Sequence, residues 1–410
     1  MPEFFTLVSP DDARQKILAR VKPIADVETI PTADGLGRVL AEDVVSPQIL
    51  PEFRRSTVDG YAVRAQDTFG ASESLPAYLK LIGEVPMGKA STVTVSAGTL
   101  ALVHTGGMIP EGADAAVMIE NTQISAQDEI EVRRPAAPGE NLIQPGEDIQ
   151  PGDPILSAGS ILRAQDIGGL LAVGIATISV RRRPRVAIFA TGDEVIEPQE
   201  ATGPGQVRDV NSYAVAVLVE SAGGVAIKGG ILPDHFETLL ARSQQALGEG
   251  ADMLVLSAGS SVSVRDMTSE VFNRLGEPGV LVHGVATKPG KPTILGVANG
   301  VPVIGLPGNP VSAFVQFMTI GLPVLYRLMG ATPPRRLRVR ATLTANVASA
   351  AGREDYVPCQ LVERDGALMA DPIFFKSNLI FTLVKADGLL VIPLDKTGLE
   401  AGQSVEVVVF

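Results

Sequence analysis

The sequence has few of the residues that build covalent or metal-bound frameworks. A single cysteine among 410 residues, Cys359, excludes an intramolecular disulfide framework and a cysteine-rich zinc site. The three histidines, His104, His235 and His283, lie far apart in the sequence and show no ligand spacing. A histidine-based metal site is therefore not expected.

Two kinds of segment are also missing. The N-terminus has no basic region followed by an apolar run, so no signal peptide is expected. The longest weakly polar stretch, Gly168–Val180, has about 13 residues, fewer than the roughly 20 that a membrane-spanning helix needs. The net charge of −12 disfavours general binding to nucleic acid or to a membrane surface. We expect a cytoplasmic protein that has neither partner and that binds any anionic substrate through basic groups concentrated in a cleft.

The length and composition indicate a soluble protein of several domains. At roughly 100–200 residues per domain, 410 residues predict two to four domains. Residues 9–22 predict a helix with Ser9 as its N-cap, and short β runs separated by Gly and Pro follow from about residue 45 to 180. The basic run Arg181–Arg185 is interpreted as a solvated linker. A second basic cluster, Arg335–Arg340, precedes a β-rich tail that predicts a small barrel or sandwich.

Strands and helices alternate between these two basic clusters. The predicted strands are Val186–Ala190, Val225–Ile231, Met253–Ser257, Val280–Ala286, Thr293–Val297 and Val301–Leu306. The predicted helices are one capped by Asn211, one opened by Asp234, one from about Met267, and a long one that follows Pro307–Pro310 and runs to about Met329. This alternation is typical of a doubly wound, mostly parallel sheet.

Ligands of such sheets bind beyond the carboxyl ends of the strands, where this sequence places small, acidic and basic residues. Glu194, Asp234 and Asp266 follow three predicted strands, Gly305–Pro310 begins a helix, and Lys288 and Lys291 add two cations. Each feature alone is more often a turn, a helix cap or a solvated charge. Together they favour a phosphate or nucleotide site with a divalent metal, for which Mg²⁺ suits hard carboxylates. No nucleophile triad is visible, and spacing alone favours Asp59 as a turn residue.

Motifs along nearly the whole chain carry a family resemblance. They are Ser56–Arg64, Thr105–Met118, Pro138–Ile149, Ala190–Glu194, Ser257–Asp266, Lys288–Pro292, Gly305–Ala313, Lys376-Ser377 and Ala386–Leu389. With these the sequence resembles the molybdopterin molybdenumtransferases, bacterial molybdate-insertion enzymes related to the E domain of gephyrin. The resemblance implies an extended linker domain (1–45 and 140–180), a β domain with the Asp59 loop (46–139), an α/β domain that binds the pterin nucleotide (181–331) and a C-terminal β-barrel (332–410).

The resemblance also implies a reaction and its residues. The enzyme inserts molybdate into adenylylated molybdopterin, with Mg²⁺-dependent hydrolysis and release of AMP, and it works as a homodimer whose active site lies between subunits. Glu194, Asp234 and Asp266 bind the metal or orient the attacking oxygen, while Asp59 and Thr105 reach the site from the partner subunit. Lys288 and Lys291 bind the anion. The other implied substrate-binding residues are Gly192, Ser257, Gly259, Ser261, Pro307, Gly308, Asn309, Ser312, Arg353, Lys376 and Ser377.

The sequence departs from the family pattern at several positions. Arg54-Arg55 replaces an Asp-Asn pair, Ile143 replaces an arginine, and Ala258 and Ser263 replace glycines. We hypothesise that Arg54, Arg55 or Arg265 supplies the positive charge that is lost at position 143, because a planar guanidinium binds oxyanions in a bidentate way. The departures also leave tungstate open as the oxyanion.

Two other functions remain open from the sequence. One is adenylyl transfer to the pterin, and the other is a non-catalytic scaffold like gephyrin. The β domain with Asp59 favours insertion over adenylyl transfer, and the retained acidic and lysine residues argue against lost catalysis. The pterin adenylyltransferase is itself a candidate partner.

Overall fold

A computed structural model describes residues 7–258, 262–374 and 376–410 of the chain. The chain divides into two compact units. Unit 1 comprises the residues up to Glu42, Ala158–Ile167 and Thr177–Phe410, and unit 2 comprises Asp43–Ser157 and Gly168–Ala176. The boundaries of the four predicted domains stay predictions, and each unit is described by itself below.

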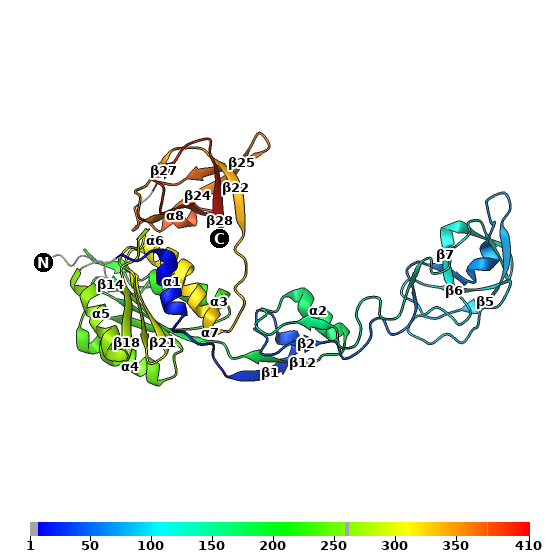
Figure 1. The fold of residues 1–410 in the computed structure, drawn as a ribbon, viewed down its shortest axis with the longest axis horizontal. Coiled ribbons are helices and arrows are strands. Elements are labelled where there is room, and N and C mark those ends of the chain that lie inside the picture. Colours follow the sequence, from blue (N-terminus) through cyan, green and yellow to red (C-terminus); the bar gives the residue numbers. More distant parts are fainter. Residues whose placement is uncertain (1–6, 259–261, 375) are drawn as a thin grey trace. The chain divides into compact units, whose positions relative to one another are not determined.

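A six-stranded sheet forms the centre of unit 1 (Figure 1). Its strand order is β16 (Val225–Leu232), β13 (Arg185–Thr191), β17 (Met253–Ala258), β21 (Val301–Pro307), β20 (Ile294–Ala298) and β18 (Pro278–His283). The first four strands are parallel, and β20 pairs antiparallel with both β21 and β18, so β20 runs opposite to the other five strands. The prediction of a mostly parallel sheet is therefore confirmed.

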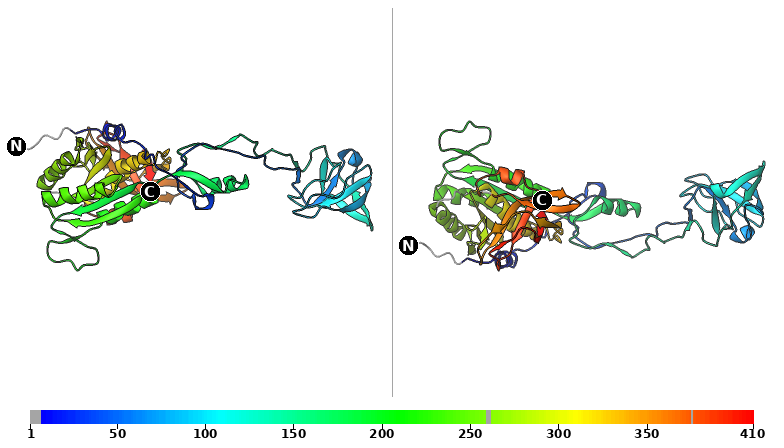
Figure 2. Two further views of the ribbon diagram at one scale, coloured as in Figure 1. Left: turned by 90° about the horizontal axis from the view of Figure 1, so that it is seen from below. Right: turned by 90° about the horizontal axis from the view of Figure 1, so that it is seen from above.

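Helices cover both faces of this sheet because alternate residues along each strand point to opposite sides. On one face, Val186 and Ile188 pack with α1 (Pro10–Leu18), α3 (Asn211–Ser221) and α7 (Leu322–Leu328). On the other face, Ala187 and Phe189 pack with α4 (Phe236–Gly248) and α5 (Val262–Leu275). In Figure 2 the segment between the short strands β14 (Val195–Ile196) and β15 (Val207–Arg208) extends away from the sheet.

The long helix after β21 corrects the expectation about apolar segments. It consists of α6 (Pro310–Gln316), the π-helical turn η4 (Phe317–Gly321) and α7. Its 19 residues are long and apolar enough to cross a membrane, and 72% of the most apolar stretch is buried inside the protein. This segment is longer than Gly168–Val180, and its burial identifies it as a core helix.

Helix starts show where local prediction succeeded and failed. Ser9 caps α1, since its Oγ accepts the Asp12 N–H at 3.1 Å. Asn211 does not cap α3, because Asp209 Oδ1 accepts the Ser212 N–H at 3.0 Å instead. Asp234 lies two residues before α4 and makes no capping bond. Helix α5 begins five residues before the predicted Met267.

The first basic run is not a solvated linker. Strand β12 (Thr177–Arg181) pairs with β1 (Val27–Pro31). Arg182 makes a bidentate bond with Asp252, at 2.9 Å for both oxygens, and also pairs with Asp26. Asp26 and Asp252, which lie far from Arg182 in the sequence, thus fix the segment that leads into β13.

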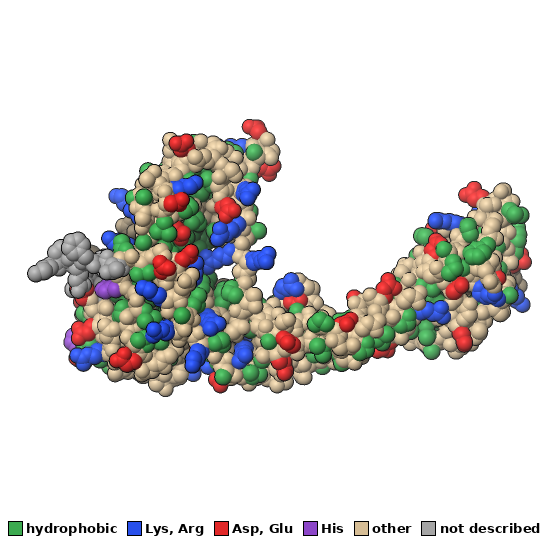
Figure 3. All heavy atoms as spheres, in the orientation of Figure 1, with side chains coloured by type: hydrophobic (Ala, Val, Ile, Leu, Met, Phe, Trp, Pro, Cys, Tyr) green, Lys and Arg blue, Asp and Glu red, His purple; other side chains and the backbone are tan. Residues whose placement is uncertain are grey.

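The C-terminal part of unit 1 is a closed five-stranded barrel. Its order is β24 (Glu354–Arg364), β25 (Ala367–Pro372), β22 (Arg338–Leu343), β28 (Ser404–Val409) and β26 (Gly388–Ile392), which pairs back to β24. Strand β19 (Thr287–Lys288) of the α/β region adds to the barrel sheet alongside β24. This addition and the contact of α6 with Tyr356 and Leu389 join the two parts. Lys and Arg side chains gather where the parts meet on the face in Figure 3.

Unit 2 contains a mixed six-stranded sheet. Its order is β7 (Ala115–Met118), β4 (Gly60–Val63), β6 (Thr99–Val103), β5 (Ala77–Glu84), β9 (Glu129–Val132) and β8 (Thr122–Ala126). Two two-stranded ribbons each pair a strand that precedes this sheet in the sequence with one that follows it. In the first, β2 (Val44–Val45) pairs with β11 (Pro154–Leu156), and in the second, β3 (Arg55–Ser56) pairs with β10 (Leu142–Ile143). One of the four boundaries between the units falls within α2 (Ala164–Ala172).

Candidate active site

A cavity of about 550 Å³ lies in unit 1 between the sheet and the barrel. We call it the basic cavity, because four cationic side chains line it and its described lining contains no carboxylate. Nine predicted substrate-binding residues line it: Lys288, Lys291, Pro307, Gly308, Asn309, Ser312, Arg353, Lys376 and Ser377. A protein with a net charge of −12 thus concentrates positive charge where an oxyanion can bind.

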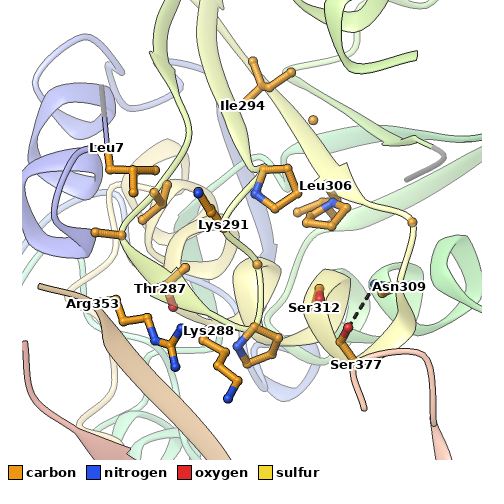
Figure 4. A pocket seen from close by; sticks show the side chains of 18 of the residues that line it. Leu7, Thr287, Lys288, Lys291, Ile294, Leu306, Asn309, Ser312, Arg353 and Ser377 are labelled. Atoms are coloured by element: carbon orange, nitrogen blue, oxygen red, sulfur yellow. Dashed lines mark hydrogen bonds between the residues drawn. The ribbon is translucent and has the colours of Figure 1, made fainter. Parts of the chain in front are cut away.

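A buried carboxylate orients Arg353 in this cavity. Arg353 Nε and Nη2 donate to Asp355 Oδ1 and Oδ2 at 2.8 and 3.2 Å, and the Asp355 side chain is only 3% exposed. Lys288 stands opposite Asp355 in the β19–β24 pairing, so Lys288 and Arg353, which directly precedes β24, approach the cavity side by side (Figure 4). Asp355 occupies the Nε–Nη2 edge of the Arg353 guanidinium. The remaining Nη1–Nη2 edge can bind an oxyanion in a bidentate way.

A hydrogen bond from α6 holds the loop that carries Lys288 and Lys291. The buried Gln316 donates from Nε2 to the Pro289 carbonyl at 3.0 Å. Gly290 has a φ of +113°, and a Cβ there would lie 2.4 Å from the Gln316 side chain. Only glycine therefore fits the turn between the lysines. The role of Gln316 was not predicted, although an amide in an otherwise apolar helix is a signal of one.

A second cavity of about 580 Å³ lies beyond the carboxyl ends of β13 and β17. We call it the strand-end cavity; Glu194 and Ser257 line it, and it shares Gly308 and Asn309 with the basic cavity. Asn211, which sequence analysis took for a helix cap, donates from Nδ2 to Ser257 Oγ at 2.9 Å and to the Gly308 carbonyl at 2.8 Å.

The strand-end cavity presents unsatisfied polar atoms. Thr191 Oγ1 and Asn211 Oδ1 are buried and have no hydrogen-bond partner among the described residues. Unpaired buried polar atoms are costly, so a polar ligand that bonds to them would be favoured. Asn309 donates to Ser377 Oγ at 2.9 Å, which ties the shared loop to the barrel (Figure 4).

Carboxylates gather near this cavity, but not in the predicted set. Burial raises the pKa of Asp234, and the Asp193 and Glu194 carboxylates raise this pKa further. Asp234 Oδ1 is buried without a partner among the described residues. Asp266 lies exposed on α5, a helix that begins earlier than predicted. Within residues 7–258, 262–374 and 376–410, no three His, Cys, Asp or Glu side chains form a metal-binding group.

These residues nevertheless fit Mg²⁺ that is shared with a substrate. Mg²⁺ is usually held by one or two carboxylates together with phosphate oxygens, so a complete protein cage is not required. An unpartnered oxygen of Asp234 close to Glu194 is such a partial site. Gly192 leaves room for the Glu194 carboxylate, because a Cβ at position 192 would lie 2.7 Å from Glu194 Oε2. The φ of Gly192 is +139°, which also favours glycine.

The remaining predicted residues lie elsewhere. Asp59 and Thr105 belong to unit 2, where the Thr105 N–H donates to Asp59 Oδ1 at 2.8 Å. Gly259 and Ser261 lie outside the described residues. The structure thus brings predicted residues together in the basic cavity and in the strand-end cavity of unit 1, and it brings Asp59 and Thr105 together in unit 2.

Comparison with known proteins identifies the family. Three family models match successive parts of the chain: the MoeA N-terminal region (domain I and II) at residues 8–174, a probable molybdopterin binding domain at 187–327, and the MoeA C-terminal region (domain IV) at 340–410. Molybdopterin molybdenumtransferase 2 of Mycobacterium tuberculosis is 33% identical over 402 residues, which cover 96% of this chain and 97% of that protein. The chain belongs to the molybdopterin molybdenumtransferase family.

Other members of the molybdopterin molybdenumtransferase family agree in sequence and fold. The molybdopterin molybdenumtransferase of Bacillus subtilis is 30% identical and covers 99% of this chain, which covers 95% of it. The crystal structure of a molybdopterin biosynthesis moeA protein from Pyrococcus horikoshii OT3 matches with a TM-score of 0.85 at 34% identity, covering 99% of this chain and 100% of that one. The family resemblance, the multi-domain fold and the prediction of a transferase are therefore confirmed.

Proposed function

We propose that this protein inserts molybdate into adenylylated molybdopterin, with Mg²⁺-dependent hydrolysis and release of AMP. The observation that carries the proposal is the pair of adjoining cavities. One is lined by four cations and suits an oxyanion, the other has carboxylates at its edge and suits a nucleotide phosphate, and the Gly308-Asn309 loop is common to both. The names of the relatives support molybdopterin as the acceptor.

In this proposal the basic cavity takes the oxyanion. Lys288, Lys291 and Arg353 bind its oxygens, with Lys376 and Ser377 on the barrel side. Molybdate and tungstate are both tetrahedral dianions, so these contacts suit either. The Asn309 amide, held by Ser377, aligns the loop between the oxyanion and the nucleotide.

The strand-end cavity takes the nucleotide end of the pterin. Thr191, Asn211 and Ser257 offer hydrogen bonds, and Glu194 and Asp234 would hold Mg²⁺ against the phosphate. When bound, Mg²⁺ would neutralise negative charge on the phosphate. The exposed Asp266 can orient the attacking oxygen from α5.

The proposal includes a partner subunit. We infer a homodimer in which Asp59 and Thr105 of unit 2 complete the site of the other chain. The pterin adenylyltransferase, which would supply the activated substrate, is a candidate transient partner. The location that we propose is the cytoplasm.

The test measures AMP release from adenylylated molybdopterin with Mg²⁺, with and without molybdate. We expect molybdate to stimulate release, and Lys288→Ala to raise the molybdate concentration for half-maximal stimulation at least about tenfold, because a charge-assisted contact is lost. The exposed barrel residue Lys396 provides the control variant Lys396→Ala, which should behave as the wild type. Release that ignores molybdate contradicts the proposal. Formation of the adenylylated pterin from ATP would favour adenylyl transfer, and binding without turnover would favour a scaffold.

A further inference from the structure

Three ionisable side chains meet at one end of three adjacent strands in the unit 2 sheet. Glu84 ends β5, His104 directly follows β6, and Asp59 directly precedes β4. His104 Nε2 lies 2.9 Å from Glu84 Oε1, and His104 Nδ1 lies 3.8 Å from Asp59 Oδ1. The imidazole therefore stands between two carboxylates, one at each of its nitrogens.

The backbone around Asp59 is fixed, but its carboxylate is open. The Thr105 N–H donates to Asp59 Oδ1, and Asp59 O accepts the Ile119 N–H at 3.0 Å. The loop before Asp59 and the loop after His104 are joined by Gly106 N–H to Ser56 O and Ser56 N–H to Gly107 O, at 2.7 and 2.9 Å. The Asp59 side chain is 64% exposed, so this carboxylate can meet a substrate or a second chain.

We propose that His104 is a positioning residue for Asp59 and makes its orientation depend on pH. An imidazolium has a donor on both nitrogens and can serve both carboxylates, whereas neutral imidazole has a single donor. Exposed ion pairs contribute little to stability, so orienting Asp59 explains this bridge better than holding the fold does. The proposal rests on the proposed function, because it gives Asp59 a place in the reaction.

The electrostatic surroundings of His104 are simple. Among the described residues, Asp59 and Glu84 are the titratable groups recorded within ion-pair distance of this imidazole. Histidine is the side chain that changes charge between about pH 5 and 8. A neutral imidazole carries no charge between the carboxylates, and its one N–H is better placed for Glu84 at 2.9 Å than for Asp59 at 3.8 Å. Among the described residues, the Thr105 N–H then remains the hydrogen-bond donor to the Asp59 carboxylate.

The experiment compares His104→Asn with the wild type in molybdate-stimulated AMP release across pH. The ratio of the two rates cancels the pH dependence of the substrates. We expect the variant to be about tenfold slower near pH 6, through a lower kcat, and to approach the wild type near about pH 8.5, where both lack the imidazolium. Glu84→Gln should change the wild-type pH profile, because it removes a partner of the imidazole, and Glu73→Gln, at an exposed turn of the same unit, should leave the profile unchanged.

Several results would overturn the inference. Equal rates for His104→Asn and the wild type at every pH exclude a role for His104, and a constant deficit at every pH indicates a merely structural one. An independent readout is the NMR signal of the His104 ring, assigned by its loss in His104→Asn. Asp59→Asn should change the chemical shifts of that ring, because the carboxylate beside Nδ1 is removed, and unchanged shifts refute the coupling even if no turnover is found. A wild type without molybdate-stimulated release refutes the proposed function, not this coupling.

Discussion

At the scale of single residues, Asp234 is a carboxylate that the fold leaves unsatisfied. Its pKa is raised by burial and then by Asp193 and Glu194, so the folded state binds this proton more tightly than the unfolded state. Its contribution to stability is therefore present at low pH and lost as pH rises through the raised pKa. Carboxylates whose pKa is raised in this way often bind a ligand or take part in a reaction, at a cost in stability.

Asp234→Asn should therefore stabilise the protein and inactivate it. We expect the free energy of unfolding at neutral pH to rise on the order of 0.5 kcal/mol, a small gain because solvent screens this half-buried group. AMP release should fall about 100-fold or more, and Mg²⁺ should no longer raise the melting temperature. Asp395→Asn, at an exposed turn, is the matched control. A less stable Asp234→Asn would contradict this explanation.

Motifs predicted residues whose type and neighbours in the sequence suffice to define them. Lys288, Lys291 and Ser377 were predicted in this way and line one cavity. Gln316 and Asn211 were missed because their partners, Pro289 and Gly308, lie 27 and 97 residues away. A pairing that the chain makes only after folding leaves no local trace in the sequence.

At the scale of elements, the pairing of β3 with β10 bears on the missing arginine. Ile143 stands directly opposite Arg55 in this ladder. The Arg55 guanidinium lies 4.7 Å from the centre of the Phe53 ring, and its Nε is buried without a partner among the described residues. Arg54 already donates to the Ala113 carbonyl at 2.9 Å. The side chain of Arg265 lies outside the described part, so Arg55 is the best-supported source of the replacement charge.

Arg55→Ala should then slow molybdate insertion about tenfold with little loss of stability, because a contact to the substrate anion is removed. Arg54→Ala should instead cost about 1 kcal/mol of stability, the contribution of one hydrogen bond, with little change in insertion. The double variant Arg55→Asn, Ile143→Arg returns the charge from the opposite strand and should restore the rate. The idea that Arg55 replaces the charge missing at position 143 is wrong if Arg54→Ala slows insertion more than Arg55→Ala does. It is also wrong if the double variant does not recover the insertion rate.

Elements were predictable where hydrophobic periodicity and turn residues agree. Five of the six strands predicted for the α/β region lie within one residue of their predicted bounds, whereas β18 begins and ends earlier than the predicted Val280–Ala286. Asn299-Gly300 forms the expected turn with positive φ at both residues. The start of α5 was missed because Ser and Gly near its beginning indicate a loop. Strand β19 was missed because two residues carry no periodicity and acquire their partner from the barrel.

At the scale of the whole molecule, the order of sheet, helices and barrel followed from the sequence, whereas the division of the predicted site residues between two cavities did not. The basic cavity needs Arg353 and Lys376 from the barrel beside Lys288 from the α/β region. Such convergence depends on packing between parts, such as α6 against Tyr356 and Leu389. Dimerisation likewise has no signature in the sequence, so the shared site requires its own test.

Co-expression of two inactive variants can test whether two chains share one site. Asp59→Ala damages unit 2 and Lys291→Ala damages unit 1, so each alone should be nearly inactive. If Asp59 serves the partner chain, a mixed dimer contains one site with both defects and one intact site. Equal co-expression makes half of the dimers mixed, each with half its sites intact, so about a quarter of the wild-type activity should return. Lys288→Ala with Lys291→Ala places both defects in the same unit and should restore nothing, because every site then keeps a defect. Failure of the first pair to recover activity would mean that Asp59 does not act across a dimer.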